Sequence, residues 1–182
     1  MSTLSRENSA LVIIDVQNEV VESAHNRDEI VANIQRAVTK ARENRTQVIW
    51  VQHSDEFLPI DSDGWQIVPE LVPTTAEPII RKLFRSSFEE TDLEKVLLDL
   101  DIGHLYICGA ETNNCVRHTS HAALERGYDI TLLADAHTTT DWHWQDRPVL
   151  ASQVIDEANR AFHNYRLPGR SATSTSVSEA KL

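Results

Sequence analysis

The chain has 182 residues, of which 41% are hydrophobic and 25% are charged, a balance typical of one globular domain. Its 28 acidic and 17 basic residues give a formal net charge of −11, and no Lys/Arg-rich run occurs. We therefore expect neither a nucleic acid nor an anionic membrane surface as a partner, because both are bound through clustered cations. The first apolar run, residues 10–14, is too short for a signal-peptide core or a membrane span, so we expect a cytoplasmic location.

Short apolar runs alternate with helical patterns along the chain. Five runs are rich in β-branched residues and have the length of strands, and four other segments repeat apolar residues at the spacing of one helix face. The expected strands cover residues 10–16, 47–52, 78–82, 104–108 and 129–134, and the expected helices cover residues 27–44, 91–100, 113–126 and 148–165. A capping box at Thr91 and Glu94 starts the second helix, and Pro148 suits the start of the last one.

This alternation predicts an α/β fold with three layers, in which a mostly parallel sheet is flanked by helices on both faces. We expect one domain over residues 1–167. Residues 53–77 form a long irregular stretch, which is typical of a functional loop. Residues 168–182 are polar and contain little apolar surface, so we expect a frayed C-terminal tail.

Three chemically reactive side chains follow the carboxyl ends of predicted strands, where the sites of parallel sheets lie. Asp15 ends the first strand, Lys82 ends the third, and Cys115 comes in the first turn of the helix after the fourth. A helix start and a nearby ammonium both favour a thiolate, so we expect a lowered pKa for Cys115. Asp15 would then move the proton, and His137 is not needed as a base. The second cysteine, Cys108, lies within an apolar run and is expected to pack in the core.

The segments 10–20 (ALVIIDVQNEV), 81–91 (RKLFRSSFEET) and 107–136 resemble the isochorismatase-like cysteine hydrolases. The last segment begins with ICGAETNNCV and is the most specific of the three. The resemblance covers residues 8–165 in order and implies a Rossmann-like isochorismatase fold.

The resemblance also implies roles for particular residues. The family's catalytic triad maps onto Asp15, Lys82 and Cys115. A cis peptide bond is implied before Glu111, and the backbone N–H groups of Glu111 and Cys115 would form an oxyanion hole. The family's polar pair after the first Asp corresponds here to Gln17 and Asn18, and would orient that Asp. Family members are homo-oligomers, so we expect a dimer or tetramer in which a neighbouring subunit can contribute to the pocket.

One departure concerns metal binding. Nicotinamidases of this family carry an Asp-x-His…His cluster after the second strand, whereas this chain has His53 and Asp55 in a different order and spacing. We therefore expect no metal and no other cofactor, and we do not expect nicotinamide as the substrate.

These observations together predict a cysteine-dependent hydrolase of C–N bonds in a small amide, carbamoyl or ureido compound, acting through a thioester. Two alternatives stay open, namely a vinyl-ether hydrolase of the isochorismatase type and a non-catalytic binding protein with the same fold. Aromatic and polar side chains near the same sheet edge are expected to line the pocket, with Trp142 as a lid, a subunit contact or a simple helix cover. The expected pocket residues are Gln17, His53, Phe57, Trp65 and Trp142.

Overall fold

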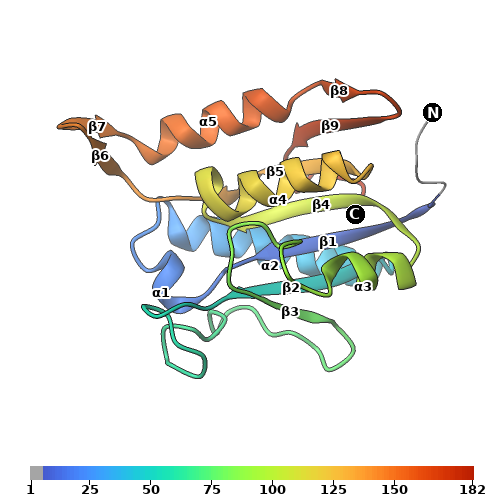
Figure 1. The fold of residues 1–182 in the computed structure, drawn as a ribbon, viewed down its shortest axis with the longest axis horizontal. Helices are drawn as coiled ribbons and strands as arrows, with labels where there is room; N and C mark the ends of the chain where they lie inside the picture. Colours follow the sequence, from blue (N-terminus) through green and yellow to red (C-terminus); the bar gives the residue numbers. More distant parts are fainter. Residues whose placement is uncertain (1–5) are drawn as a thin grey trace.

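The computed structural model describes residues 6–182 and has a seven-stranded central sheet (Figure 1). The strand order is β3-β2-β1-β4-β5-β9-β8, and every neighbouring pair is parallel except β8 and β9. The strands are β1 (Asn8–Ile14), β2 (Gln47–His53), β3 (Ile79–Lys82), β4 (Ile102–Ala110), β5 (Asp129–Thr138), β8 (Tyr165–Leu167) and β9 (Arg170–Thr175). The mostly parallel sheet of the sequence prediction is therefore confirmed, with two additional strands at one side.

Helices cover both faces of this sheet. They are α1 (Asn18–Val21), α2 (Arg27–Glu43), α3 (Leu93–Asp99), α4 (Arg117–Glu125) and α5 (Ala151–Phe162), with a π-helical turn η1 (Thr112–Val116) before α4. Figure 1 shows α3 and α4 in front of the sheet and α2 behind it. A separate two-stranded hairpin of β6 (Trp142–Trp144) and β7 (Arg147–Val149) precedes α5.

A hydrophobic core lies on each face of the sheet. These two cores explain why β1 is apolar at every position from Ala10 onward. Successive side chains of a strand point to opposite faces, so a strand buried on both faces needs apolar residues throughout. Leu11 and Ile13 pack with α2, whereas Val12 and Ile14 pack with α3, α4 and α5. This arrangement confirms the three predicted layers.

A close backbone contact joins β1 to β4 just before the loops that follow them. Ile14 pairs with Gly109, whose φ is 112°, a conformation that favours glycine. A Cβ atom at this position would lie 2.0 Å from the carbonyl oxygen of Ile14. Glycine therefore lets the two strands that lead to Asp15 and Glu111 end side by side.

The C-terminal segment corrects the sequence prediction. Residues 168–182 are not a frayed tail, because β9 pairs with β5 inside the sheet and three later side chains are buried in the core with α2. These three are Val177, Ala180 and Leu182. Lys40 on α2 donates hydrogen bonds to three carbonyl oxygens of the same segment, including that of Ala180. The folded unit extends to the last residue, while residues 1–5 of the expected domain lie outside the described part.

The buried C-terminal segment should contribute measurably to stability. Replacing Val177 by Ala is expected to lower the free energy of unfolding by about 2 kcal/mol, because it removes two buried methyl groups and leaves a cavity. Urea unfolding measures this loss, and Lys181→Ala, at an exposed position of the same segment, is the control. Equal stabilities of the two variants would contradict the docking of this segment.

The last helix also begins later than its sequence predicts. Pro148 lies in β7, and α5 starts at Ala151, whose backbone N–H donates to Asp141 Oδ1 at 2.7 Å.

No helix within residues 6–182 has the length and apolar character needed to cross a membrane.

Candidate active site

Three side chains from separate elements meet beyond the carboxyl ends of the strands. Lys82, the last residue of β3, places its Nζ 2.7 Å from Asp15 Oδ2 and 3.2 Å from Cys115 Sγ. The side chains of Lys82 and Asp15 are 0% and 2% exposed, so water screens this ion pair little. The acid, the amine and the thiol that the sequence places at one sheet edge therefore lie together, with the ammonium contacting both other groups.

The backbone around each residue fixes these positions. Asp15 follows β1 with a φ of 50°, in the left-handed region, and its N–H donates to the carbonyl oxygen of Val51 on β2. Lys82 is held by the register of β3 against β2, where it pairs with His53. The peptide bond between Ala110 and Glu111 is cis, as the family resemblance implies.

The expected lowered pKa of Cys115 is wrong. Burial and, second, the charge of Asp15 raise the pKa of this thiol to about 12, and Lys82 only partly opposes them. Cys115 is the fourth residue of a five-residue π-helical turn, so it lacks the position in a regular first turn on which the expectation was based. Burial and the charge of Asp15 therefore both favour the neutral thiol of Cys115.

The same burial makes Asp15 a stronger base than an ordinary aspartate. Loss of water around its carboxylate raises the pKa of Asp15, although the ammonium of Lys82 acts in the opposite direction. Transfer of the Cys115 proton to Asp15 would leave the total charge of the three groups unchanged. An internal proton transfer of this kind needs no change in the charge of the buried cluster.

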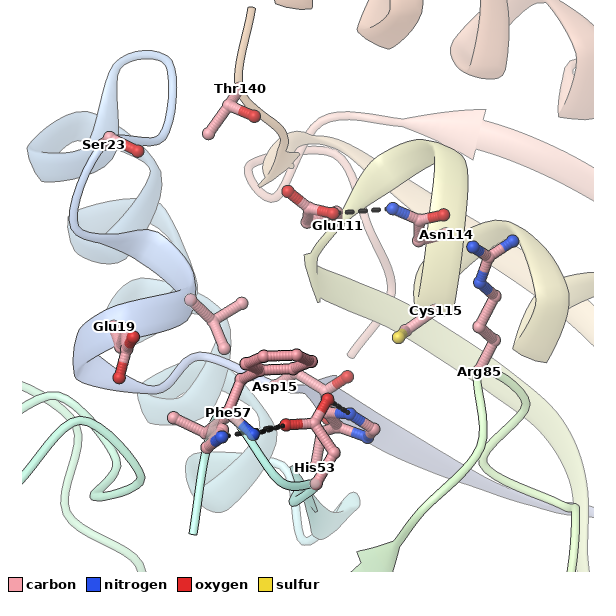
Figure 2. A pocket seen from close by; sticks show the side chains of 13 residues that line it. Asp15, Glu19, Ser23, His53, Phe57, Arg85, Glu111, Asn114, Cys115 and Thr140 are labelled. Atoms are coloured by element: carbon pink, nitrogen blue, oxygen red, sulfur yellow. Dashed lines mark hydrogen bonds and ion pairs between the residues drawn. The ribbon is translucent and has the colours of Figure 1, made fainter. Parts of the chain in front are cut away.

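A pocket of about 390 Å³ opens onto this cluster. Figure 2 shows the side chain of Cys115 directed into it. The pocket is lined by Asp15, Glu19, Val20, Ser23, His53, Asp55, Phe57, Leu58, Arg85, Glu111, Asn114, Cys115 and Thr140. Its size and its mixture of apolar and polar groups suit a small organic molecule.

The five predicted pocket residues do not all reach this pocket. His53 and Phe57 line it, and Phe57 is 79% exposed at its mouth. Gln17 and Trp65 are buried beside it and are not among the lining residues. Trp142 lies on the β6–β7 hairpin and does not line it either.

Gln17 instead joins three chain segments next to the pocket. Its Nε2 donates to the carbonyl oxygens of His53 and Trp65, and its Oε1 accepts from the N–H of His53. One buried amide thus ties the turn after β1 to the end of β2 and to the loop that follows.

His53 and Asp55 contact each other. Their Nε2 and Oδ2 atoms are 3.1 Å apart, and the other oxygen of Asp55 accepts from the N–H groups of Phe57 and Leu58. The contact with His53 is the main cause that lowers the pKa of Asp55. Within residues 6–182, no three His, Cys, Asp or Glu side chains are grouped so that they could hold a metal ion.

Sequence reasoning gave no role to the side chains of several residues that line the pocket. Glu111 was considered only for its backbone N–H, and Arg85 lay inside a matching segment without an assigned role. Glu19 and Asn114 each lie within four residues of Asp15 or Cys115, respectively. Proximity in sequence to the candidate triad was the available signal for these residues.

His137 is a buried, hydrogen-bonded residue that does not line the pocket. The side chain is fully buried, its Nδ1 lies 2.8 Å from the Thr112 hydroxyl, and its Nε2 lies 3.0 Å from Asn159 Oδ1. Asn159 Oδ1 can only accept, so Nε2 carries the proton and Nδ1 accepts from Thr112. Burial lowers the pKa of His137 to about 4.

This lowered pKa predicts a specific loss of stability in acid. Between pH 6.5 and pH 4 the unfolded state binds a proton at residue 137 that the folded state does not bind. From pH 7.5 to pH 4 the wild-type protein should therefore lose about 3 kcal/mol more unfolding free energy than His137→Gln. Urea titrations at the two pH values test this, with the exposed His143→Gln as control; parallel losses in wild type and His137→Gln would contradict it.

Comparisons with known proteins identify the family of this chain. The isochorismatase domain model matches residues 9–166, so the chain belongs to the isochorismatase family. A streptothricin hydrolase from Streptomyces noursei is 30% identical over 138 residues, which are 72% of this chain and 55% of that protein. The chain thus spans about half the length of that relative.

Solved structures show the same fold. An isochorismatase from Pseudomonas putida KT2440 is 28% identical and superposes with a TM-score of 0.84, covering 94% of this chain and 89% of that one. N-carbamoylsarcosine amidase from Thermoplasma acidophilum is 22% identical and superposes with a TM-score of 0.76. This likeness covers 97% of this chain and 100% of the amidase chain. The second likeness concerns the fold alone.

Proposed function

We propose that the protein hydrolyses a C–N bond in a small amide, carbamoyl or ureido compound, with Cys115 as the nucleophile. The observation that carries this proposal is the Lys82 ammonium, which contacts both the Asp15 carboxylate and the Cys115 sulfur at the wall of a small pocket. A thiol, a base and a cation held in reach of one another can form and break a thioester.

The first half of the reaction forms the thioester. Asp15 takes the proton of Cys115, and the thiolate attacks the carbonyl carbon of the substrate while Lys82 stabilises the new negative charge on sulfur. The carbonyl oxygen becomes an oxyanion, which accepts hydrogen bonds from the backbone N–H groups of Glu111 and Cys115. Asp15 then gives its proton to the departing nitrogen, and the C–N bond breaks.

The second half regenerates the enzyme. Asp15 is again ionised and takes a proton from water, whose oxygen attacks the thioester carbonyl. The C–S bond breaks, the thiolate takes the proton back from Asp15, and a carboxylic or carbamic acid leaves. The raised pKa of Asp15 supports its role as the base toward Cys115 and toward water, since a carboxyl group of higher pKa accepts protons more readily than an ordinary aspartate.

A screen of small amides and ureas for ammonia or amine release tests this function. Wild-type protein should release the amine from at least one compound class, and the same compounds should be inert with Cys115→Ala. Release of pyruvate from a vinyl ether, undiminished in that variant, would instead identify an enzyme that does not use the thiol.

A further inference from the structure

Two carboxylates on the pocket wall lack a cationic partner. Glu111 lies at one side of the pocket and Glu19 across it from Cys115, as Figure 2 shows. Within residues 6–182, neither forms an ion pair with Lys or Arg, whereas the carboxylates of Glu70 and Glu77 elsewhere in the protein are paired with arginines. Glu111 therefore acts on whatever enters the pocket, and Glu19, whose carboxylate lies next to Gly64 at the border with a neighbouring pocket, adds its charge at the rim.

The carboxylate of Glu111 is fixed by neutral groups. Asn114 Nδ2 donates to its Oε2 at 2.6 Å, and the backbone carbonyl of Asn114 in turn accepts from His118 Nδ1 at 2.8 Å. An amide donor orients the carboxylate without neutralising it. The position of the negative charge is thus set by the local fold, four residues before the thiol.

The remaining lining charges do not cancel these two. Asp15 is compensated by Lys82, and the two oxygens of Asp55 are engaged by His53 and by backbone N–H groups. Arg85 is the lining residue that carries a guanidinium, and it is exposed on the same side as Cys115 in Figure 2. The part of the pocket away from the thiol is therefore acidic, in a protein whose net charge is −11.

We propose that the substrate is an amide bearing an ammonium or guanidinium group, which binds between Glu111 and Glu19. This inference rests on the proposed function and names its substrate class. These carboxylates attract a positive group on the substrate, and that group also offsets the penalty that their negative charge imposes on the oxyanion. A low-dielectric pocket also focuses the field of its charges on an entering ion.

Charge preference can be measured at the thiol itself, without any turnover. Two methanethiosulfonates of opposite charge, the trimethylammonium reagent MTSET and the sulfonate reagent MTSES, form a mixed disulfide with Cys115 as the S–SO2 bond of the reagent breaks and methanesulfinate leaves. Peptide mapping gives each rate at Cys115 separately from the buried Cys108. The ratio of the two rates is compared with the same ratio for 2-mercaptoethanol, a neutral reference thiol.

The expected ratio for wild-type protein is about tenfold above the reference in favour of MTSET. Glu111→Gln and Glu19→Gln should each reduce this ratio about threefold, and Arg85→Gln should increase it. Glu22 lies near Glu19 but does not line this pocket. The control variant Glu22→Gln should therefore leave the ratio unchanged. A wild-type ratio at or below the reference, or a ratio insensitive to both pocket variants, overturns the proposal. Glu19 is exposed, so its variant remains informative should Glu111→Gln fail to fold.

A second measurement uses matched amides. The specificity ratio kcat/KM of β-alaninamide over propanamide should exceed one and fall in Glu111→Gln, while succinamate should be the poorest of the three. No preference for β-alaninamide overturns the substrate class but leaves the C–N hydrolysis intact. Hydrolysis that persists in Cys115→Ala overturns the proposed function instead, whatever the ratio of the two thiol reagents.

Discussion

Cys115→Ala is expected to lower amide hydrolysis about 10⁴-fold or more while the protein remains folded, because every covalent step of the proposed reaction passes through this sulfur. The side chain is partly exposed at the pocket wall, so its removal leaves no large buried cavity. Product release over time and thermal unfolding of the same preparation give the two measurements.

The other cysteine provides the control. Cys108 is fully buried in the core that α2 covers, with its sulfur 3.8 Å from the carbonyl oxygen of Val12. Cys108→Ala should keep hydrolysis and lose about 1–2 kcal/mol of unfolding free energy. Retention of more than a few per cent of the activity in Cys115→Ala would refute the covalent mechanism.

Asp15→Asn should change hydrolysis and thiol reactivity in opposite directions. Hydrolysis should fall about 10³-fold, because Asn cannot carry a proton to the leaving nitrogen. The pKa of Cys115 should fall below its value of about 12, since a negative charge that disfavours the thiolate is removed while Lys82 stays. Alkylation by iodoacetamide at pH 8 should therefore be faster in the variant than in the wild type.

Lys82→Met distinguishes this explanation from a general disturbance of the site. Removal of the ammonium takes away the cation that favours the thiolate, so both hydrolysis and alkylation should slow. Rates of alkylation are measured between pH 6 and pH 10 for the wild type, Asp15→Asn and Lys82→Met. Faster alkylation in Asp15→Asn together with slower alkylation in Lys82→Met supports the charge effect, whereas a general disturbance of the site would not change the two rates in opposite directions. Slower alkylation in Asp15→Asn would contradict the charge balance assigned to the cluster.

The central sheet was predictable because its strands are buried on both faces. Such strands need unbroken apolar runs, and the runs at β1, β2 and β4 stand out from the helices between them. The strand β9 has no such run, because its residues are mostly Ser and Thr. It is a strand through its pairing with β5, a tertiary effect that local composition does not contain.

The candidate triad was predictable for a topological reason, whereas its electrostatics were not. Parallel strands direct their carboxyl ends to one edge, so Asp15 and Lys82 were expected at the same edge once the sheet was inferred. That they meet depends on the strand order β3-β2-β1, which the sequence does not predict. The protonation state of Cys115 depends on how deeply the sulfur is buried and how near Asp15 lies. Neither quantity is encoded in the spacing of these residues along the chain, and the same is true of the direction of the Glu111 side chain.

The position of Lys82 has a consequence for the dynamics of the enzyme. It is carried by β3, a four-residue strand at the edge of the sheet that is paired with β2 alone. Edge elements with few neighbours open more often than central strands. Each such opening would withdraw the ammonium from both Asp15 and Cys115 and leave the buried Asp15 carboxylate without its ion-pair partner. Hydrogen exchange at the amides of β3 would then report directly on the fraction of molecules that are competent to react.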